Sequence, residues 1–445
     1  MEQGNSIFGT QRISKLLLKL APPIMAAQLI QALYNIVDSY FIGKFSSDGL
    51  SALSVIFPIQ LLISAFAIGT GVGVNTVMAK YYGLKREKEA RETAGVGIII
   101  SVISWIIFAA VSCLIMGVYC KMSLKSVAAQ EYAKSYGLIV CAFSIGIFTE
   151  SNFSKILQAK GDMKTPMTAQ IVGALVNIVF DYLLIFGIGK IKPLGVSGAA
   201  IATVLGQIIA AIITGLKAYT KPNFKLVKKY IKPIYKAGVP NILMNALCTI
   251  YIIALNLILV SFSDEAVTVL GLYYKLQTFL LIPLLALTTC IIPILSFNYA
   301  AKKYDRCKKI LWETVIFSAI CMIIGTLVFE LFPKQLLSIF AKGNEQVIKI
   351  GINAFRIIAI SFTPFSLSLV MPTYFQAIGK NAQSIFISVL RQIILLVPLA
   401  WIFSKFGLQY VWLTFPITEF IDALASYLLY LKYGRANIKT QGLTN

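Results

Sequence analysis

Among the polar residues inside the apolar stretches of the first half, four could form one site: Asp38, Asn177, Asp181 and Thr203. Asn177 and Asp181 are four positions apart, so a helix places both on one face. Ionisable groups inside membrane-crossing segments are costly, and they commonly form ion or proton pathways. Two carboxylates, an amide and a hydroxyl therefore predict a cation-coupling site that binds H⁺ or Na⁺ and no other metal.

The heights of these residues along their helices support a shared site. Asp38 follows Pro23 by 15 positions, and Asp181 follows Pro166 by 15 positions. At about 1.5 Å per residue, each carboxylate lies roughly 22 Å above the inner membrane face. Thr203 lies about 12 Å below the outer end of its own helix, in a hydrocarbon core about 30 Å thick. Two neighbouring acids disfavour double ionisation and can hold one proton near neutral pH. The alternative role is a structural salt bridge or an interhelical hydrogen bond.

The second half has a polar set of its own. Arg391 lies in one apolar stretch, and Glu419 and Asp422 lie in the next. Arg391 and Glu419 are predicted to form an ion pair, or alternatively Glu419 faces a cavity and attracts cationic substrates. We therefore interpret these three residues as a possible substrate site or second-lobe polar site. Glu150 and Glu330 fall nearer to the ends of their stretches.

The residue types argue against an enzyme. The chain has no histidine, which removes the usual proton shuttle and the commonest metal ligand. The segment Gly69–Thr–Gly–Val–Gly73 lacks the Lys-Ser/Thr of a phosphate-binding loop, and we expect it to allow close helix packing. The seven cysteines are scattered and do not indicate a disulfide framework. We expect no catalytic residues and no cofactor.

Long apolar stretches must position these side chains. The chain has 445 residues, of which 58% are hydrophobic and 13% charged, whereas soluble domains average about 45–50% and about 25%. About twelve stretches reach the roughly 20 residues that cross a bilayer. They are 16–42, 50–79, 93–118, 131–157, 165–189, 194–216, 237–262, 270–297, 310–332, 350–377, 383–404 and 409–432. The predicted fold is an all-α membrane protein with twelve transmembrane helices.

Matching segments recur in the two halves. Lys19–Leu–Ala–Pro–Pro23 corresponds to Lys236–Ala–Gly–Val–Pro240 at an offset of 217. Leu157–Gln–Ala–Lys–Gly161 corresponds to Phe375–Gln–Ala–Ile–Gly379 at an offset of 218. The repeat predicts two pseudo-symmetric six-helix lobes, related by an axis along the membrane normal.

The repeat also helps to distinguish residues needed for function from residues needed only for helix packing. The position equivalent to Asp38 is Leu255, and the position equivalent to Asp181 is Leu399. Residues needed only for helix packing are expected to tolerate the symmetry. The asymmetry therefore favours a functional role for the two acids.

Basic residues concentrate before the first stretch, after the last, and in the connections that follow even-numbered stretches. The positive-inside rule then places both termini in the cytoplasm. We expect an N-lobe over 1–216, a cytoplasmic linker over 217–236 and a C-lobe over 237–445. The net charge of +22 is explained by this topology and by attraction to anionic lipid, not by nucleic-acid binding.

Five strings occur in a fairly specific order and spacing. They are Val37–Asp–Ser–Tyr–Phe–Ile–Gly43, Leu157–Gln–Ala–Lys–Gly161 with Pro166, Asn177–Ile–Val–Phe–Asp181, Gly198–Ala–Ala–Ile–Ala–Thr203 and Arg391–Gln392. In these strings the chain resembles the multidrug and toxic compound extrusion (MATE) family over nearly its full length, and is most similar to the bacterial DinF/MepA-like branch. The resemblance implies efflux of cationic or amphiphilic compounds in exchange for protons or sodium. It also implies that Asp38, Asn177, Asp181 and Thr203 match the family's N-lobe cation site.

The expected function is that of a secondary antiporter, which exports small organic compounds in exchange for H⁺ or Na⁺ by alternating access between its lobes. An apolar, aromatic-rich cavity between the lobes is expected to bind amphiphilic cations. The alternative is a flippase for lipid-linked sugars, which would favour a basic cavity and extra helices. We expect a monomer in the plasma membrane of a bacterium, with small organic substrates and membrane lipid as its partners.

Overall fold

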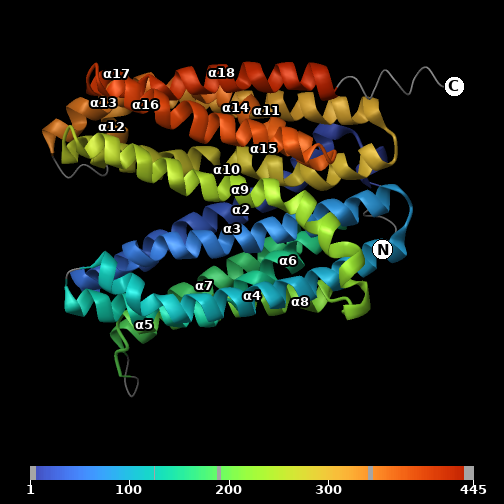
Figure 1. Cartoon of the computed structure of the whole chain (residues 1–445), viewed down its shortest axis with the longest axis horizontal. Coiled ribbons are helices and arrows are strands. Elements are labelled where there is room, and N and C mark those ends of the chain that lie inside the picture. Colours follow the sequence, from blue (N-terminus) through green and yellow to red (C-terminus); the bar gives the residue numbers. More distant parts are fainter. Residues whose placement is uncertain (1–6, 125, 188–191, 339–343, 435–445) are drawn as a thin grey trace. The chain divides into compact units, whose positions relative to one another are not determined.

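The computed structural model describes residues 7–124, 126–187, 192–338 and 344–434. Within these ranges the chain is helical almost throughout and contains no strand (Figure 1). Among the described residues, nine helices are long and apolar enough to cross a membrane, and two bent pairs bring the number to 11. The prediction of an all-α membrane protein is confirmed.

The helices follow one another with short connections. Those of the first half are α2 (Ile13–Phe45), α3 (Ser47–Gly83), α4 (Glu87–Ser123), α5 (Val127–Ala142), α6 (Ile145–Ala159), α7 (Lys164–Phe186) and α8 (Val196–Ala218). Those of the second half are η1 (Phe224–Leu226), α9 (Val227–Val260), α10 (Asp264–Ala300), α11 (Tyr304–Leu331), α12 (Pro333–Ser338), α13 (Glu345–Ala359), α14 (Phe362–Ala377), α15 (Asn381–Val389), η2 (Leu390–Leu396), α16 (Val397–Ser404), α17 (Leu408–Trp412), α18 (Thr414–Leu429) and η3 (Tyr430–Gly434).

Two predicted spans, 131–157 and 350–377, are broken rather than continuous. The axes of α5 and α6 differ by 42°, and those of α13 and α14 differ by 54°. At the first break the Ser144 hydroxyl donates to the Cys141 carbonyl over 2.8 Å. At the second, the Ser361 hydroxyl donates to the Ile358 carbonyl over 2.6 Å. Each of these carbonyls also accepts the backbone N–H of the same serine, so the serine bonds twice to the last turn before the break.

The helices form two compact units. The first contains Pro22–Ile242, and the second contains Gln11–Ala21 and the chain from Leu243 onward. Both α2 and α9 thus begin in one unit and end in the other. Pro22 and Pro23 lie at the change in α2, and Pro240 lies beside the change in α9. Proline has no N–H and weakens a helix where it occurs. The lobe boundaries 1–216 and 237–445 and the cytoplasmic location of 217–236 stay predictions.

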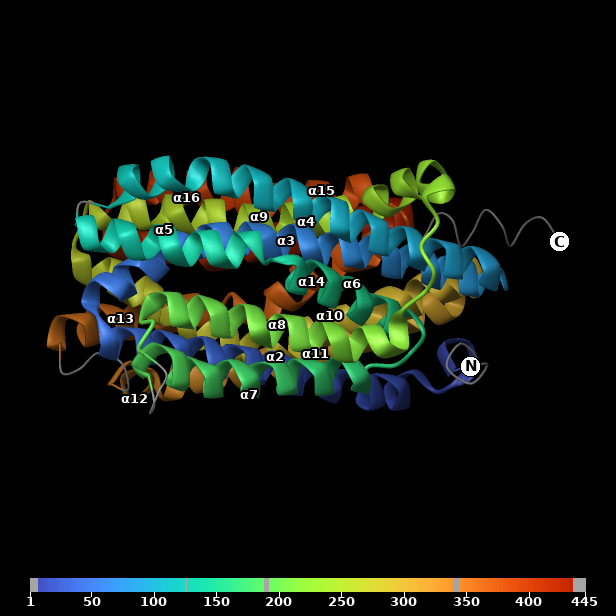
Figure 2. The ribbon, with the colours of Figure 1, turned by 90° about the horizontal axis from the view of Figure 1, so that it is seen from below.

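In the first unit α3 packs against α4, α5 and α6, while α8 packs against α5, α6 and α7. Figure 2 shows α7 and α8 side by side along most of their length. The glycines of α3 face the beginning of α9, where a Cβ on Gly73 would overlap the Ile234 carbonyl and a Cβ on Gly238 would overlap the Gly69 carbonyl. The predicted role of Gly69 and Gly73 in close helix packing is confirmed.

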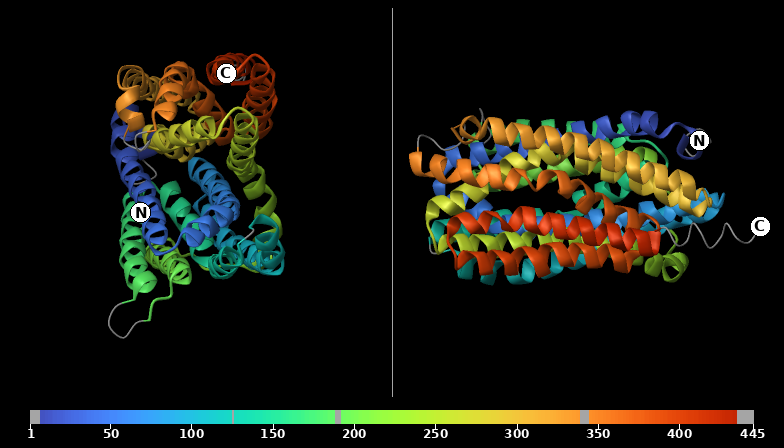
Figure 3. Two further views of the ribbon diagram at one scale, coloured as in Figure 1. Left: turned by 90° about the vertical axis from the view of Figure 1, so that its left-hand side faces the viewer. Right: turned by 90° about the horizontal axis from the view of Figure 1, so that it is seen from above.

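In the second unit α14 is central and packs against α10, α11, α15 and α18. The right-hand view of Figure 3 shows the orange and red helices of this unit running side by side. The twelfth predicted stretch, 409–432, corresponds to α17, α18 and the beginning of η3. All seven cysteines of the chain are free thiols.

Candidate functional site

Helices α7 and α8 cross closely at two glycines. A Cβ on Gly173 would lie 2.7 Å from the Gly206 carbonyl oxygen, and a Cβ on Gly206 would lie 2.5 Å from the Gly173 carbonyl oxygen. Asn177 follows Gly173 by one turn, and Thr203 precedes Gly206 by about one turn. The Asn177 Nδ2 donates a hydrogen bond to Thr203 Oγ1 over 3.4 Å. The small residues at the crossing thus bring the amide and the hydroxyl together.

We expect Gly206→Ala to lower the free energy of unfolding by about 1–3 kcal/mol, because the added methyl forces the two backbones apart. Thermal unfolding in detergent measures this effect. Gly271→Ala in α10 is the matched control, since a Cβ there meets nothing within 4 Å. Equal unfolding temperatures for both variants would show that the α7–α8 crossing accommodates the added methyl group without strain.

The two acids of the first unit are buried without a basic partner. Asp38, on α2, is 8% exposed, and Asp181, on α7, is 0% exposed. They lie within electrostatic range of each other. Among the described residues neither forms an ion pair, and neither Asp38 Oδ1 nor the Asp181 oxygens has a hydrogen-bond partner. The salt-bridge role considered as an alternative is therefore not observed in the described chain.

Two adjoining cavities of the first unit meet at Thr203. The larger has a volume of about 400 Å³ and is lined by Asp38. The smaller has a volume of about 90 Å³ and is lined by Asn177. Gln31, Tyr34, Ile147, Thr203 and Gln207 line both cavities. Asp181 lines neither of these two cavities and is fully buried.

Glu150 also belongs to this region, although the sequence analysis placed it near the end of its stretch and did not assign it to the site. It lines the smaller cavity and accepts hydrogen bonds from the Ser154 hydroxyl over 2.6 Å and from Gln170 Nε2 over 3.4 Å. The signal in the sequence is the spacing of four between Glu150 and Ser154, which puts both on one helix face. The break before α6 sets the position of that face.

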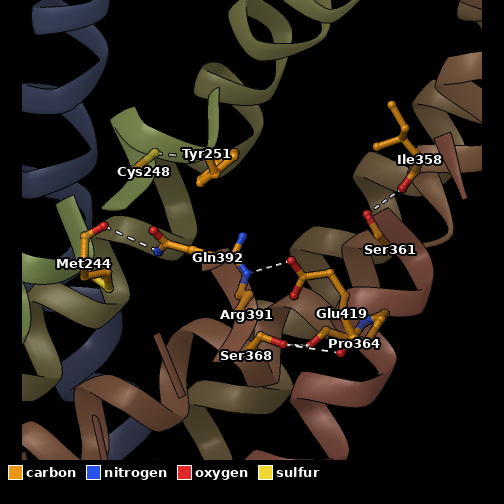
Figure 4. Close-up of polar contacts among 10 residues, drawn as sticks. All are labelled: Met244, Cys248, Tyr251, Ile358, Ser361, Pro364, Ser368, Arg391, Gln392 and Glu419. Atoms are coloured by element: carbon orange, nitrogen blue, oxygen red, sulfur yellow. Dashed lines mark hydrogen bonds and ion pairs between the residues drawn. The ribbon is translucent and has the colours of Figure 1, made fainter. Parts of the chain in front are cut away.

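In the second unit Arg391 and Glu419 form the ion pair that the sequence predicts. Arg391 Nε lies 2.7 Å from Glu419 Oε1, and the two side chains are 13% and 4% exposed (Figure 4). The guanidinium also lies over the Phe365 ring, 4.6 Å from its centroid, a cation–π contact. Asp422, one turn after Glu419, is 0% exposed. A role of these residues in substrate binding stays a prediction.

Arg391 lies in η2, a π-helical segment. Such wide turns commonly occur at functional sites. Gln392 follows Arg391, and its Nε2 donates to the Met244 carbonyl over 3.4 Å (Figure 4). The Ser368 hydroxyl donates to the backbone carbonyl of Glu419, also over 3.4 Å. These bonds link η2 to α9 and α14 to α18, so both members of the ion pair are attached to neighbouring helices. Among the described residues no group of three Cys, Asp or Glu side chains is placed to hold a metal ion.

A family model described as MatE matches residues 23–183 and 240–402 of the chain. A protein named FAD transporter, from Shewanella oneidensis, is 25% identical, with 94% of each chain covered. The multidrug export protein MepA of Staphylococcus haemolyticus is 23% identical, with 98% of this chain and 97% of that protein covered. The probable multidrug resistance protein NorM of Thermotoga maritima is 22% identical, with 90% and 88% covered.

Solved structures of transporters share the fold. A transporter of the MOP superfamily from Pyrococcus furiosus superposes with a TM-score of 0.91 at 22% identity, with 99% of each chain covered. An outward-facing multidrug resistance MATE transporter gives a TM-score of 0.90 at 23% identity, with 98% of each chain covered. The predicted fold, twelve transmembrane helices in two lobes, is the fold of these transporters.

Proposed function

Because the chain belongs to the MatE family, whose members are membrane transporters rather than enzymes, we propose that it exports small organic compounds in exchange for H⁺ or Na⁺. The observation that carries the coupling part is the pair of buried acids, Asp38 and Asp181, with no basic partner among the described residues. Uncompensated buried charges are costly, so a site of this composition favours a bound cation.

The coupling cation enters from the larger cavity, where it meets Asp38 first. It is then shared with Asp181, which lies deeper. The side-chain Nδ2 of Asn177 donates to Thr203. The side-chain Oδ1 of Asn177 has no hydrogen-bond partner among the described residues and is therefore available to a cation. Because the cation removes the repulsion between the acids, the loaded and empty states prefer different conformations, which is what coupling requires. No cofactor takes part in this scheme.

We propose that the substrates are cationic or amphiphilic. The lining of the larger cavity includes Asp38 and the rings of Tyr34, Phe57 and Tyr136, and no Lys or Arg of the described residues contributes to it. Aromatic faces and a carboxylate attract organic cations. A dinucleotide such as the FAD named for one relative, or a lipid-linked sugar phosphate, would be better held by basic residues.

Purified protein in proteoliposomes tests this function directly. Proton and sodium gradients are imposed separately, and uptake of ethidium is compared with uptake of FAD. We expect ethidium to move under at least one of the gradients and FAD to move under neither. Movement of FAD alone would overturn the cationic assignment, and gradient-independent movement of every compound would overturn antiport.

The distribution of the basic residues supports the placement of the protein. The concentration of basic residues on alternate connections favours cytoplasmic termini in a bacterial plasma membrane. The linker 217–236 would then lie on the cytoplasmic side, and the protein would act as a monomer.

A further inference from the structure

Helix α18 carries a column of buried polar side chains at every fourth position. The column consists of Thr414, Thr418, Asp422 and Ser426, each 0% exposed. Successive members share a helix face. Among the described residues none of the three hydroxyls has a hydrogen-bond partner, and the polar side chain that lies close to the Asp422 carboxylate is the Ser368 hydroxyl.

The hydroxyls of α18, like that of Ser318 in α11, differ from the hydrogen-bonded hydroxyls of the unit. A buried hydroxyl in a helix is commonly satisfied by the carbonyl four residues earlier. Thr373 of α14 does this, with its hydroxyl 3.1 Å from the Leu369 carbonyl. The hydroxyls of α18 make no such bond, so they are free to donate and accept along the column.

Asp422 also has no basic residue as its own partner. The charged residues that act on it are Glu419 and Arg391, and Arg391 is already paired with Glu419. Helix α18 packs against α14, α15, α16 and α17. These four helices contain no charged residue. The charged residues of α13 and η3 are all exposed: Glu345, Lys349, Arg356 and Lys432. An ionised Asp422 would therefore be an uncompensated buried charge.

We propose that Asp422 carries a second transported proton and that Thr414, Thr418 and Ser426 conduct it along α18. The fully buried side chain has no room for an organic cation, whereas a proton needs none. Neighbouring members of the column are about 6 Å apart along the helix axis, so proton transfer between them requires a bridging water. The carboxylate accepts the proton on one side of the membrane and releases it to water on the other.

This proposal rests on the proposed antiport function and adds a second coupling ion to it. The cation at Asp38 and Asp181 is required for every turnover, and the proton at Asp422 adds to the driving force. Each coupled proton raises the equilibrium accumulation ratio about tenfold per pH unit. A second proton is therefore measurable as a change in stoichiometry.

The test measures ethidium accumulation in proteoliposomes under a proton gradient of one pH unit, with the membrane potential clamped. We expect Asp422→Asn to lower the ratio about tenfold, Asp422→Glu to retain the wild-type ratio, and the sodium-driven component to stay unchanged. Thr373→Val is the control and retains the wild-type ratio. A wild type without gradient-driven transport would overturn the antiport function itself.

A coupled wild type with an unchanged ratio in Asp422→Asn would overturn the second proton alone. If Asp422→Asn does not insert, the wild-type stoichiometry decides, because one coupling cation per substrate contradicts the proposal and two support it. Ser426→Ala and Thr418→Val are expected to slow proton-driven transport without changing the final ratio. Wild-type rates in both would show that the proton does not travel along α18.

Discussion

Asp38→Asn and Asp181→Asn are each expected to abolish gradient-driven export while the protein remains folded and inserted. An amide neither releases a proton nor supplies the negative charge that a sodium ion requires. Asp181→Asn leaves the lining of the larger cavity unchanged and is expected still to bind substrate, but the exchange loses its link to the gradient. Transport in proteoliposomes at matched protein content, under separate proton and sodium gradients, measures the loss.

The repeat supplies the controls for this experiment. Leu255 and Leu399 occupy the equivalent positions of the second half, and conservative replacement of either by Met is expected to leave coupling intact. Full gradient-dependent export by both Asn variants would place the coupling site elsewhere, with Glu419 as the next candidate.

Arg391→Met is expected to have the largest effect on stability, about 3–5 kcal/mol, because it leaves Glu419 buried without its partner. The double variant Arg391→Met/Glu419→Gln is expected to recover most of that loss, since no unpaired charge remains. Arg391→Lys is expected to be less stable than the double variant. An ammonium does not reproduce the Nε contact with Glu419 or the stacking of the guanidinium on Phe365.

Thermal unfolding of the three variants in the same detergent gives the comparison. A double variant as unstable as Arg391→Met would mean that the loss comes from packing around residue 391 and not from the uncompensated carboxylate.

The fold was largely predictable because the bilayer imposes its thickness on the sequence. Apolar stretches of sufficient length can be counted, and the charged connections orient them. The two broken spans were not predicted, since the first break contains no proline or glycine and the proline at the second, Pro364, falls in the first turn of α14, where proline is tolerated. Ser144 and Ser361 are nevertheless 217 positions apart, the offset found elsewhere in the repeat, so the break is a repeated feature whose meaning only the geometry reveals.

The site was predictable to a smaller extent. Asp38 and Asp181 stand out because carboxylates are rare in apolar helices, and counting residues along the helices also grouped Asn177 with Thr203. The hydroxyl column of α18 did not stand out, because Ser and Thr are ordinary residues in membrane helices. Whether their hydroxyls are satisfied depends on packing, and a single sequence does not record packing.

The exchange of helix ends between the two units has a consequence for the order of assembly. Gln11–Ala21 is synthesised first but belongs to the unit that otherwise begins at Leu243. At about 5–20 residues per second, roughly 10–45 s pass before the ribosome reaches that point. Leu16 and Leu17 are 0% and 1% exposed in the folded chain. During this time the rest of the unit in which they are buried has not been synthesised. The earliest part of the chain thus completes the latest unit, and that unit cannot begin to assemble until the ribosome has passed Leu243.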